Sequence, residues 1–199
     1  MSPEQRAASI LDAAKAEFVE RGFEAARIDD IARRAGIAKG TVYLHFPSKE
    51  ALFLALVRVA VVPAVHAMRT LVDTAEGSSA DLLRGMLALI KRELLGTERR
   101  LLVRLILTEG HRFPDLAATY HDEVVSHGMA LIRAVIERGV ARGEFRADAV
   151  ARFPQLFAAP VVLAVLWEGL FGARAPLDTD GLLDAHLETL LHGLAGDRP

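Results

Sequence analysis

The sequence predicts an all-α protein of about nine helices, with a small helix-turn-helix domain at the N-terminus and a larger helical domain after it. Three observations support this fold class. Alanine and leucine abound while β-branched runs are short, which favours helices over strands. Apolar residues recur three to four positions apart in successive segments. Hydrophobic residues make up 52% of the 199 positions, which is enough to bury a sizeable core.

The first helix is predicted over residues 3–21, where apolar positions recur at helical spacing. Pro3 suits an opening turn, and Gly22 ends the helix. Phe18 and Phe23 are expected in the core of the small domain, behind the two helices that follow.

Residues 28–46 have the layout of a helix-turn-helix. A short helix is expected over residues 28–35, Gly36 ends it, and a second short helix spans residues 39–45. In the second helix Val42 faces inward, and polar side chains face outward. Spacing alone leaves an alternative open, which is two short surface helices in an ordinary helical protein.

The charge of this motif differs from that of the whole chain, whose formal net charge is −2. Between residues 27 and 49, five basic residues stand against two acidic ones, a local net charge of +3. The basic residues are Arg27, Arg33, Arg34, Lys39 and Lys49. A basic patch on one motif of an acidic protein indicates a polyanionic partner at that motif.

Six short stretches in the first quarter of the chain stand at a fixed spacing. They are Gly22-Phe23, Asp30-Ile31-Ala32, Ala35-Gly36-Ile37, Lys39-Gly40-Thr41-Val42-Tyr43, His45-Phe46 and Ser48-Lys49-Glu50-Ala51-Leu52. Together they resemble the N-terminal DNA-binding domain of the tetracycline-repressor (TetR) family. The resemblance implies a three-helix DNA-binding domain, placed here at residues 1–47, and a ligand-binding and dimerisation domain at residues 48–199.

The resemblance also implies contacts with double-stranded DNA. The motif positions that commonly contact the operator hold Lys39, Thr41, Tyr43, His45 and Lys49. Gly40 has no side chain, so the backbone can approach closely. We expect Lys39, Gly40 and Thr41 to do most of the base reading. We expect Tyr43, His45 and Lys49 mostly to position the protein on the DNA backbone, with Lys49 as the main phosphate contact.

Arg27 marks a departure from the family pattern. In the family, the second helix usually begins with a threonine or serine near this position, which caps the helix and donates to a phosphate. Here Ala26-Arg27 stands in its place, so the cap comes from elsewhere or is absent. Arg27 itself is a candidate phosphate contact.

The next helix is predicted to be long, over residues 49–75, with Ser48 as its N-cap. Its apolar stripe is expected at Leu52, Leu56, Val59 and Val62. Pro63 removes one backbone hydrogen bond and should bend the helix near Val59. A bent helix between two domains would act as a lever, and the alternative is a kinked packing helix.

Five further helices are expected, over residues 80–95, 98–110, 114–142, 148–171 and 179–194. Ser78 and Asp148 can cap two of them, and Pro114 suits a first helical position. Pro154 and Pro160 lie within the fourth of these segments, where each would leave a carbonyl group unpaired.

The middle helices predict an apolar cavity with a few polar groups, which is typical of a small-molecule site. The candidate lining residues are Met86, Leu89, Ile90, Leu105, Thr108, Glu109, Arg112, Phe113, Tyr120, His121, Phe157 and Trp167. The alternative is plain core packing. The stretch from Thr108 to Pro114 also resembles one found in a subset of the family.

The last two helices are apolar over broad faces and predict a homodimer interface. Its candidate residues are Leu156, Val161, Val165, Leu183, Leu187, Leu190 and Leu191. The alternative is a monomer core. In a homodimer, two DNA-binding domains about 34 to 36 Å apart, or a multiple of that distance, would suit a palindromic operator.

Several classes of function are not expected. The chain has no cysteine, so disulfides and thiolate metal sites are excluded. The histidines lack the spacing of known ligand sets, and no catalytic motif is present, so we expect neither a metal, a cofactor nor an enzyme. No basic-then-apolar leader and no uninterrupted apolar run of about 18 residues is present, which favours a cytoplasmic protein without a membrane partner.

We therefore expect a homodimeric, ligand-responsive repressor that a small-molecule effector releases from a palindromic operator. In the implied mechanism, a ligand held by the middle helices moves the long helix and changes the separation of the two reading heads. The alternatives are an activator, a ligand-independent regulator, a helical protein-interaction adaptor and a helical-bundle enzyme.

Overall fold

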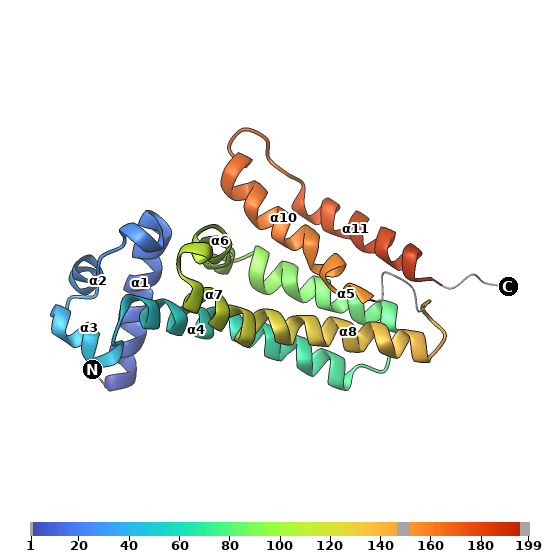
Figure 1. The fold of residues 1–199 in the computed structure, drawn as a ribbon, viewed down its shortest axis with the longest axis horizontal. Coiled ribbons are helices and arrows are strands. Elements are labelled where there is room, and N and C mark those ends of the chain that lie inside the picture. Colours follow the sequence, from blue (N-terminus) through green and yellow to red (C-terminus); the bar gives the residue numbers. More distant parts are fainter. Residues whose placement is uncertain (1, 147–151, 196–199) are drawn as a thin grey trace. The chain divides into compact units, whose positions relative to one another are not determined.

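The computed structural model describes residues 2–146 and 152–195 (Figure 1). Within these ranges the chain is built from helices, and extended pairing is confined to an isolated antiparallel bridge between Phe145 and Ala195. The all-α prediction is confirmed. The expected N-cap at Asp148 lies outside the described residues.

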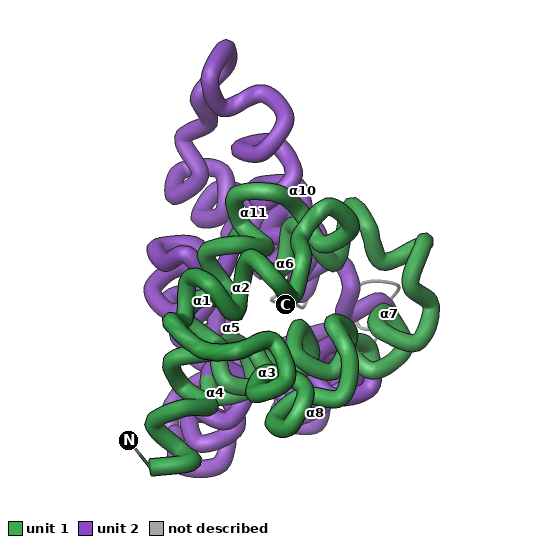
Figure 2. The backbone as a smooth tube through the Cα atoms, turned by 90° about the vertical axis from the view of Figure 1, so that its left-hand side faces the viewer, with its two compact units in different colours: residues 1–63, 101–121 green, residues 64–100, 122–199 purple. Residues whose placement is uncertain are grey.

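The chain folds into two compact units, which Figure 2 colours separately. Unit 1 comprises residues 1–63 and 101–121, and unit 2 comprises residues 64–100 and 122–199. The segment 101–121 therefore packs with the N-terminal helices, although it lies far beyond residues 1–47 in the sequence. The division within the long helix falls after Pro63.

Unit 1 contains the helix-turn-helix and a later helical segment. Its helices are α1 (Pro3–Ala25), α2 (Ile28–Arg34), α3 (Lys39–His45), the first part of α4 (Lys49–Thr74), most of α6 (Arg99–Glu109), a 3-10 turn (Gly110–Arg112) and α7 (Pro114–Tyr120). The bounds of α2 and α3 agree with the predicted helices to within a residue.

Unit 2 contains the helices of the C-terminal part. They are the end of α4, α5 (Ser79–Ile90), a π-helical turn (Lys91–Leu95), most of a second π-helical turn (His121–Val125), α8 (Ser126–Ala141), α10 (Gln155–Phe171) and α11 (Thr179–Leu194). Figure 1 shows α10 and α11 side by side, and the two helices pack against each other.

Two helices begin directly after the serines that the sequence predicts as their N-caps. The Ser48 hydroxyl accepts a hydrogen bond from the Ala51 amide at 3.1 Å, before α4. The Ser78 hydroxyl likewise accepts from the Asp81 amide at 3.1 Å, before α5. Each hydroxyl satisfies an amide that has no partner inside its helix. Both N-cap predictions are confirmed.

Gly22 interrupts α1. Its φ of 79° and ψ of 171° are not helical, so the chain turns there and forms one more turn up to Ala25. This φ lies in the left-handed region, where glycine avoids the Cβ clash of other residues. The prediction that the first helix breaks at Gly22 is confirmed.

Two predictions for later helices were wrong in detail. The segment expected as one helix over residues 114–142 contains a π-helical turn between α7 and α8. Counted as one helical stretch, it gives nine helices in the described part of the chain. Pro154 is the N-cap of α10, so the helix begins after it, because an interior proline loses a hydrogen bond and crowds the preceding turn.

The buried stripe of α4 also differs from the expected one. Val59 is 63% exposed, whereas Phe53, Val57 and Val61 are buried. Nearly every position in this part of α4 is apolar, so helical spacing did not determine which face would be buried.

α4 is long and apolar enough, by length and composition alone, to cross a membrane. Arg58 interrupts its apolar sequence, but the mean hydropathy over an 18-residue window reaches 2.0. Leu52, Phe53 and Leu56 are buried in the protein. Of that window, 33% is buried, and core helices of soluble proteins meet the same criteria of length and composition, so one such helix is weak evidence for a membrane span.

The core of unit 1 is built around phenylalanines. The Phe18, Phe23 and Phe53 rings lie with their centroids 5.1 to 5.5 Å apart, and all three side chains are buried. The predicted core positions of Phe18 and Phe23 are confirmed. Phe113 adds an edge-to-face contact with Phe23 at 4.5 Å. Such pairs add to the stabilisation that burial of the rings already provides.

The core of unit 2 is mainly aliphatic, with Phe145 and Phe157 also buried. α5 packs against α8 and α11, and α10 packs against α11. Fully buried side chains from three of these helices include Leu83, Met86, Val135 and Leu183. The helices thus bury one stripe each, as amphipathic packing requires.

Candidate nucleic-acid interface

Helices α2 and α3 pack against each other and form the expected helix-turn-helix. Ile31 of α2 and Val42 of α3 are fully buried. Gly36, with φ of 68°, makes the turn, and the Ile37 amide donates to the Ala32 carbonyl at 3.0 Å. The buried residues hold the two helices together and leave one side of α3 free for a partner.

The outward side of α3 carries four exposed residues, Lys39, Gly40, Tyr43 and Leu44. Leu44 is 86% exposed and Tyr43 is 45% exposed. Thr41 and His45 are half-buried. Sequence reasoning missed Leu44, although its place four residues after Gly40 puts both on one side of the helix.

Lys39 is already paired within the motif. Its ammonium lies 2.9 Å from the Asp29 carboxylate of α2, and both side chains are about half exposed. The hydrogen bond to Asp29 raises the pKa of Lys39. Lys39 is therefore charged at neutral pH, and its exposed partner can give way to another anion at little cost.

The arginines of α2 fall into two groups. Arg34 binds Glu20 of α1 at 2.6 Å and Glu17 at 3.5 Å, so it ties α1 to α2. The side chain of Arg33 pairs with Asp30 at 2.8 Å and remains 76% exposed. Part of the basic charge of the motif therefore serves its own structure.

Arg27 occupies the N-cap position of α2. No side-chain hydrogen bond caps this helix, so the cap that the family pattern supplies is absent here. Arg27 is exposed, and its carbonyl accepts from the Asp30 and Ile31 amides at 3.1 Å. Its side chain lies at the start of α2, within the basic motif.

Lys49 is bound to the protein itself. Its ammonium donates to the carbonyl oxygens of Glu24 at 2.9 Å and of Ala26 at 3.1 Å. The nitrogen also lies 4.8 Å from the centroid of the Phe23 ring, a cation–π contact. Burial lowers the pKa of Lys49. Lys49 thus connects the start of α4 to the end of α1 through two hydrogen bonds.

Two residues assigned to the ligand cavity contact the end of α1. The Glu109 carboxylate, at the end of α6, accepts from the Phe23 amide at 3.2 Å and the Glu24 amide at 3.1 Å. The Arg112 guanidinium binds the Glu24 carboxylate. Sequence reasoning missed this role because the partners are more than 80 residues apart.

The other candidate cavity residues are divided between the two units. Leu105, Thr108, Phe113, Tyr120 and His121 belong to unit 1, whereas Met86, Leu89, Ile90, Phe157 and Trp167 belong to unit 2. Burial raises the pKa of Tyr120 to about 12. The Trp167 indole donates to the Ala175 carbonyl at 2.7 Å.

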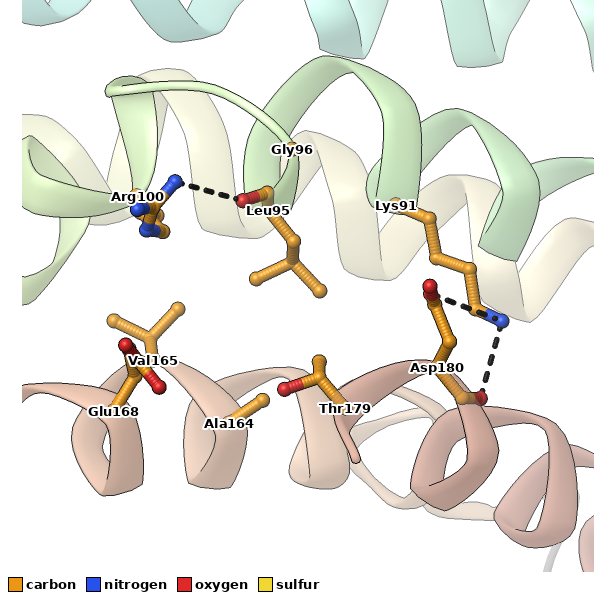
Figure 3. Close-up of a pocket in the computed structure, with 9 residues that line it drawn as sticks. All are labelled: Lys91, Leu95, Gly96, Arg100, Ala164, Val165, Glu168, Thr179 and Asp180. Carbon is orange, nitrogen blue, oxygen red and sulfur yellow. Dashed lines mark hydrogen bonds and ion pairs between the residues drawn. The ribbon is translucent and has the colours of Figure 1, made fainter. Parts of the chain in front are cut away.

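Unit 2 contains a cleft of about 250 Å³ (Figure 3). Figure 3 shows Leu95 and Val165 pointing toward each other from its opposite walls. Lys91 at one end binds Asp184 at 2.6 Å, and Arg100 at the other donates to the Leu95 carbonyl at 3.1 Å. The residues that line it are Lys91, Leu95, Gly96, Arg100, Ala164, Val165, Glu168, Thr179 and Asp180, none of which is a predicted cavity residue.

The candidate dimer residues lie mostly in the core of their own chain. Buried side chains belong to Val161, Val165, Leu183, Leu187, Leu190 and Leu191, whereas Leu156 is 41% exposed. α10 has a different exposed apolar side, formed by Leu156, Val162, Leu163, Leu170 and Phe171. We call these five residues the α10 apolar face. The sequence did not identify it because α10 is apolar nearly all round.

Within the described ranges, no group of three or more histidine, aspartate or glutamate side chains is placed to hold a metal ion.

Comparison with known proteins decides the family. The pattern described as "Bacterial regulatory proteins, tetR family" matches residues 10–56, and the "Tetracyclin repressor-like, C-terminal domain" pattern matches residues 71–180. The second match alone covers more than half of the chain. The chain belongs to the TetR family. It is thus a helix-turn-helix, DNA-binding transcriptional regulator, as the resemblance implied.

Individual TetR-family proteins resemble the chain to different extents. The transcriptional repressor KstR2 of Rhodococcus jostii is 28% identical over 191 residues, 96% of this chain and 91% of KstR2. The transcriptional activator FasR of Mycolicibacterium smegmatis is 46% identical over 55 residues, which span 28% of this chain but only a quarter of FasR.

A solved structure also shares the fold. The regulator FadR of Bacillus subtilis, in complex with stearoyl-CoA, matches with a TM-score of 0.77 at 20% identity, over 94% of this chain and 98% of that one. At 20% identity, this similarity shows a shared fold and no more.

Proposed function

We propose that this TetR-family regulator is a homodimeric repressor that a small-molecule effector releases from a palindromic operator. The observation that carries the proposal is the outward side of α3, where Lys39, Tyr43 and Leu44 are exposed on a helix that α2 holds in place. A helix presented in this way fits the major groove of B-DNA. The protein would act in the cytoplasm, where bacterial operators are found.

The proposed contacts follow from exposure and charge. Lys39, Gly40 and Thr41 would read bases, and Tyr43 and His45 would mostly position the protein on the phosphates. Arg27, exposed at the start of α2, would bind a phosphate. Lys49 was the expected main phosphate contact, but its bonds to two carbonyl oxygens support a role in holding α4 to α1.

A dimer is proposed because a single DNA-binding domain of this size makes few base contacts. Two heads held about one helical turn of DNA apart would bind the two halves of a palindrome. The α10 apolar face offers a surface for the second copy, since it leaves several large apolar side chains in water. We therefore propose that this face, together with α11, forms the two-fold interface.

The effector is proposed to bind among the middle helices. The candidate residues in unit 2 are Met86, Leu89, Ile90, Phe157 and Trp167, and the cleft beside Leu95 and Val165 is a second candidate site. Because a regulator of the same fold was solved with stearoyl-CoA, acyl-CoA thioesters are the first compounds to test.

Activation is the second candidate function, and one relative favours it. FasR is a transcriptional activator and shares 46% identity with this chain over 55 residues. A ligand-independent regulator or a helical interaction adaptor would keep the fold but not the effector response.

The deciding experiment is selection of bound sequences from a random pool of double-stranded DNA. We expect a palindrome, salt-dependent binding and two chains per duplex. Recovery of no sequence above the background of the pool would contradict the proposal. Binding unaffected by any acyl-CoA, with a palindrome present, would favour ligand-independent regulation or a different effector class.

A further inference from the structure

We propose that Glu109 and Arg112 are positioning residues for DNA binding, which hold the last turn of α1, just before α2, and so join the helix-turn-helix to α6. This inference rests on the proposed function. The turn comprises residues 22–26, and we call it the hinge turn. The stretch from Thr108 to Pro114, noted in the sequence but without a role, supplies both side chains.

The first observation is the position of Glu109. Gly22 breaks α1, so the Phe23 and Glu24 amides begin a new turn without the acceptors of a continuous helix. Each oxygen of the Glu109 carboxylate accepts from one of them, at 3.2 and 3.1 Å. A charged carboxylate that accepts two adjacent amides forms a stronger contact than a neutral acceptor.

The second observation concerns Gly22, which lies directly beside this carboxylate. A Cβ atom at Gly22 would lie 2.9 Å from the Glu109 Oε1 atom. The backbone of the hinge turn and the Glu109 side chain are therefore in close contact. A larger residue at Gly22 would push the carboxylate away from the amides.

The third observation is a second attachment at the same turn. Both terminal nitrogens of Arg112 donate to the Glu24 carboxylate, in the two-pronged geometry that arginine favours. The hydrogen bond from Arg112 lowers the pKa of Glu24. Phe113 adds its edge-to-face contact with Phe23. Three side chains of the segment 109–113 thus contact Phe23 and Glu24 of the turn.

The hinge turn leads directly into the interface. Arg27 follows it at the N-cap position of α2, and Asp29 in the first turn of α2 pairs with Lys39 of α3. Lys49 also donates to the Glu24 and Ala26 carbonyls. A displacement of the turn would therefore reach the residues that face the operator.

The hinge turn does not depend on these polar contacts for its core. Phe23 packs against Phe18 and Phe53, which belong to α1 and α4, so we expect these contacts to persist in a variant without Glu109. Loss of Glu109 should therefore change the position and mobility of the turn more than the folding of the domain.

The first test is Glu109→Ala in the full-length chain, with His111→Ala as the matched control on the exposed side of the same segment. The readouts are amide exchange at Phe23 and Glu24 and affinity for the selected duplex. We expect exchange about tenfold faster, as for loss of a charge-assisted hydrogen bond. We expect the dissociation constant to rise about fivefold or more.

The outcomes separate the two proposals. If wild-type protein selects no duplex, the proposed function fails. If wild type binds and Glu109→Ala keeps wild-type exchange at both amides, or wild-type affinity, the positioning role is overturned. His111→Ala should match wild type in both readouts, and an equal loss in this variant would also contradict the proposal.

A second test remains valid if Glu109→Ala folds poorly. Arg112→Glu and Glu24→Arg should each weaken operator binding, because each places like charges together. The double variant exchanges the charges of the pair and should recover most of the affinity. A double variant no better than the single variants would show that Arg112 does not act through Glu24.

Discussion

The Lys49 ammonium donates to the Glu24 carbonyl oxygen at 2.9 Å and joins the first turn of α4 to the end of α1. A second bond, to the Ala26 carbonyl at 3.1 Å, completes the contact. These carbonyls have no helical partner because α1 ends there. The family motif places this lysine beside DNA. In this structure, however, Lys49 holds α4 against the end of α1.

Lys49→Ala is expected to lower the free energy of unfolding by about 1 to 2 kcal/mol, because two charge-assisted hydrogen bonds at a partly exposed site are lost. The salt dependence of operator binding should stay unchanged. Lys49→Met, which keeps the aliphatic stem, controls for packing. A decrease of about 0.9 in the slope of log affinity against log salt would instead assign Lys49 to a phosphate.

Lys39 is expected to leave Asp29 when DNA binds. The exposed pair contributes only about 0 to 1 kcal/mol, so exchange of the carboxylate for a phosphate or a base costs little. Asp29→Asn should therefore raise operator affinity, and Lys39→Ala should lower it. Titrations at several salt concentrations measure both effects. A loss of affinity in Asp29→Asn would mean that the pair positions Lys39 for binding.

Leu44 is expected to contact the C5 methyl group of a thymine, because an 86% exposed leucine on the outer side of α3 has no polar group to read a base. Replacing that thymine by uracil in the selected duplex removes one methyl group. The affinity of the wild type should fall about fourfold per half-site. Burial of one carbon contributes about 0.8 kcal/mol, which corresponds to this change.

Leu44→Ala should bind thymine and uracil duplexes equally. Thr41→Ala is the matched control, since the methyl group of Thr41 is the other candidate contact on α3. If Leu44→Ala keeps the uracil penalty and Thr41→Ala abolishes it, the methyl contact belongs to Thr41.

The two left-handed glycines of unit 1 are expected to differ in their tolerance of alanine. A Cβ atom at Gly36, where φ is 68°, would meet open space, so Gly36→Ala should cost only the backbone strain, about 1 to 2 kcal/mol. Gly22→Ala should cost more, by about 1 kcal/mol or above, because its ψ of 171° at positive φ lies in a region that essentially only glycine populates and because the new Cβ atom also displaces Glu109. Urea unfolding of both variants measures the difference, and equal losses would argue against a tight contact with Glu109.

The α10 apolar face is expected to hold the dimer together. Leu163→Glu and Leu170→Glu place a charge where the partner would pack, so sedimentation should show a monomer at concentrations where wild type is a dimer. Val59→Glu is the matched control, because Val59 is 63% exposed on α4. Dimers that persist in both α10 variants would exclude this face from the interface.

Local signals in the sequence were enough to place most helices. Gly36, Val42 and the capping serine Ser48 act within a turn or two of their own position, so the bounds of α2 and α3 could be predicted closely. The π-helical turn in the segment after Pro114 could not, because it inserts a residue into a helix without a local marker.

The roles of long side chains were harder to predict than their positions. Lys39 was predicted to face outward, and it does so, but its bond to Asp29 depends on how α2 and α3 cross. Arg112 was assigned to a cavity, whereas its partner Glu24 lies 88 residues earlier in the chain. Residue type indicates which groups can pair, and only the fold selects the partner.

The sequence by itself determined the fold class, the helix-turn-helix and the family, because helical periodicity, turn residues and short motifs are local properties. The tertiary structure decided which face of α10 is exposed, since a helix that is apolar nearly all round has no periodic signal to orient it. It also decided that Glu109 binds the Phe23 and Glu24 amides, because a contact across more than 80 residues exists only once both segments have packed.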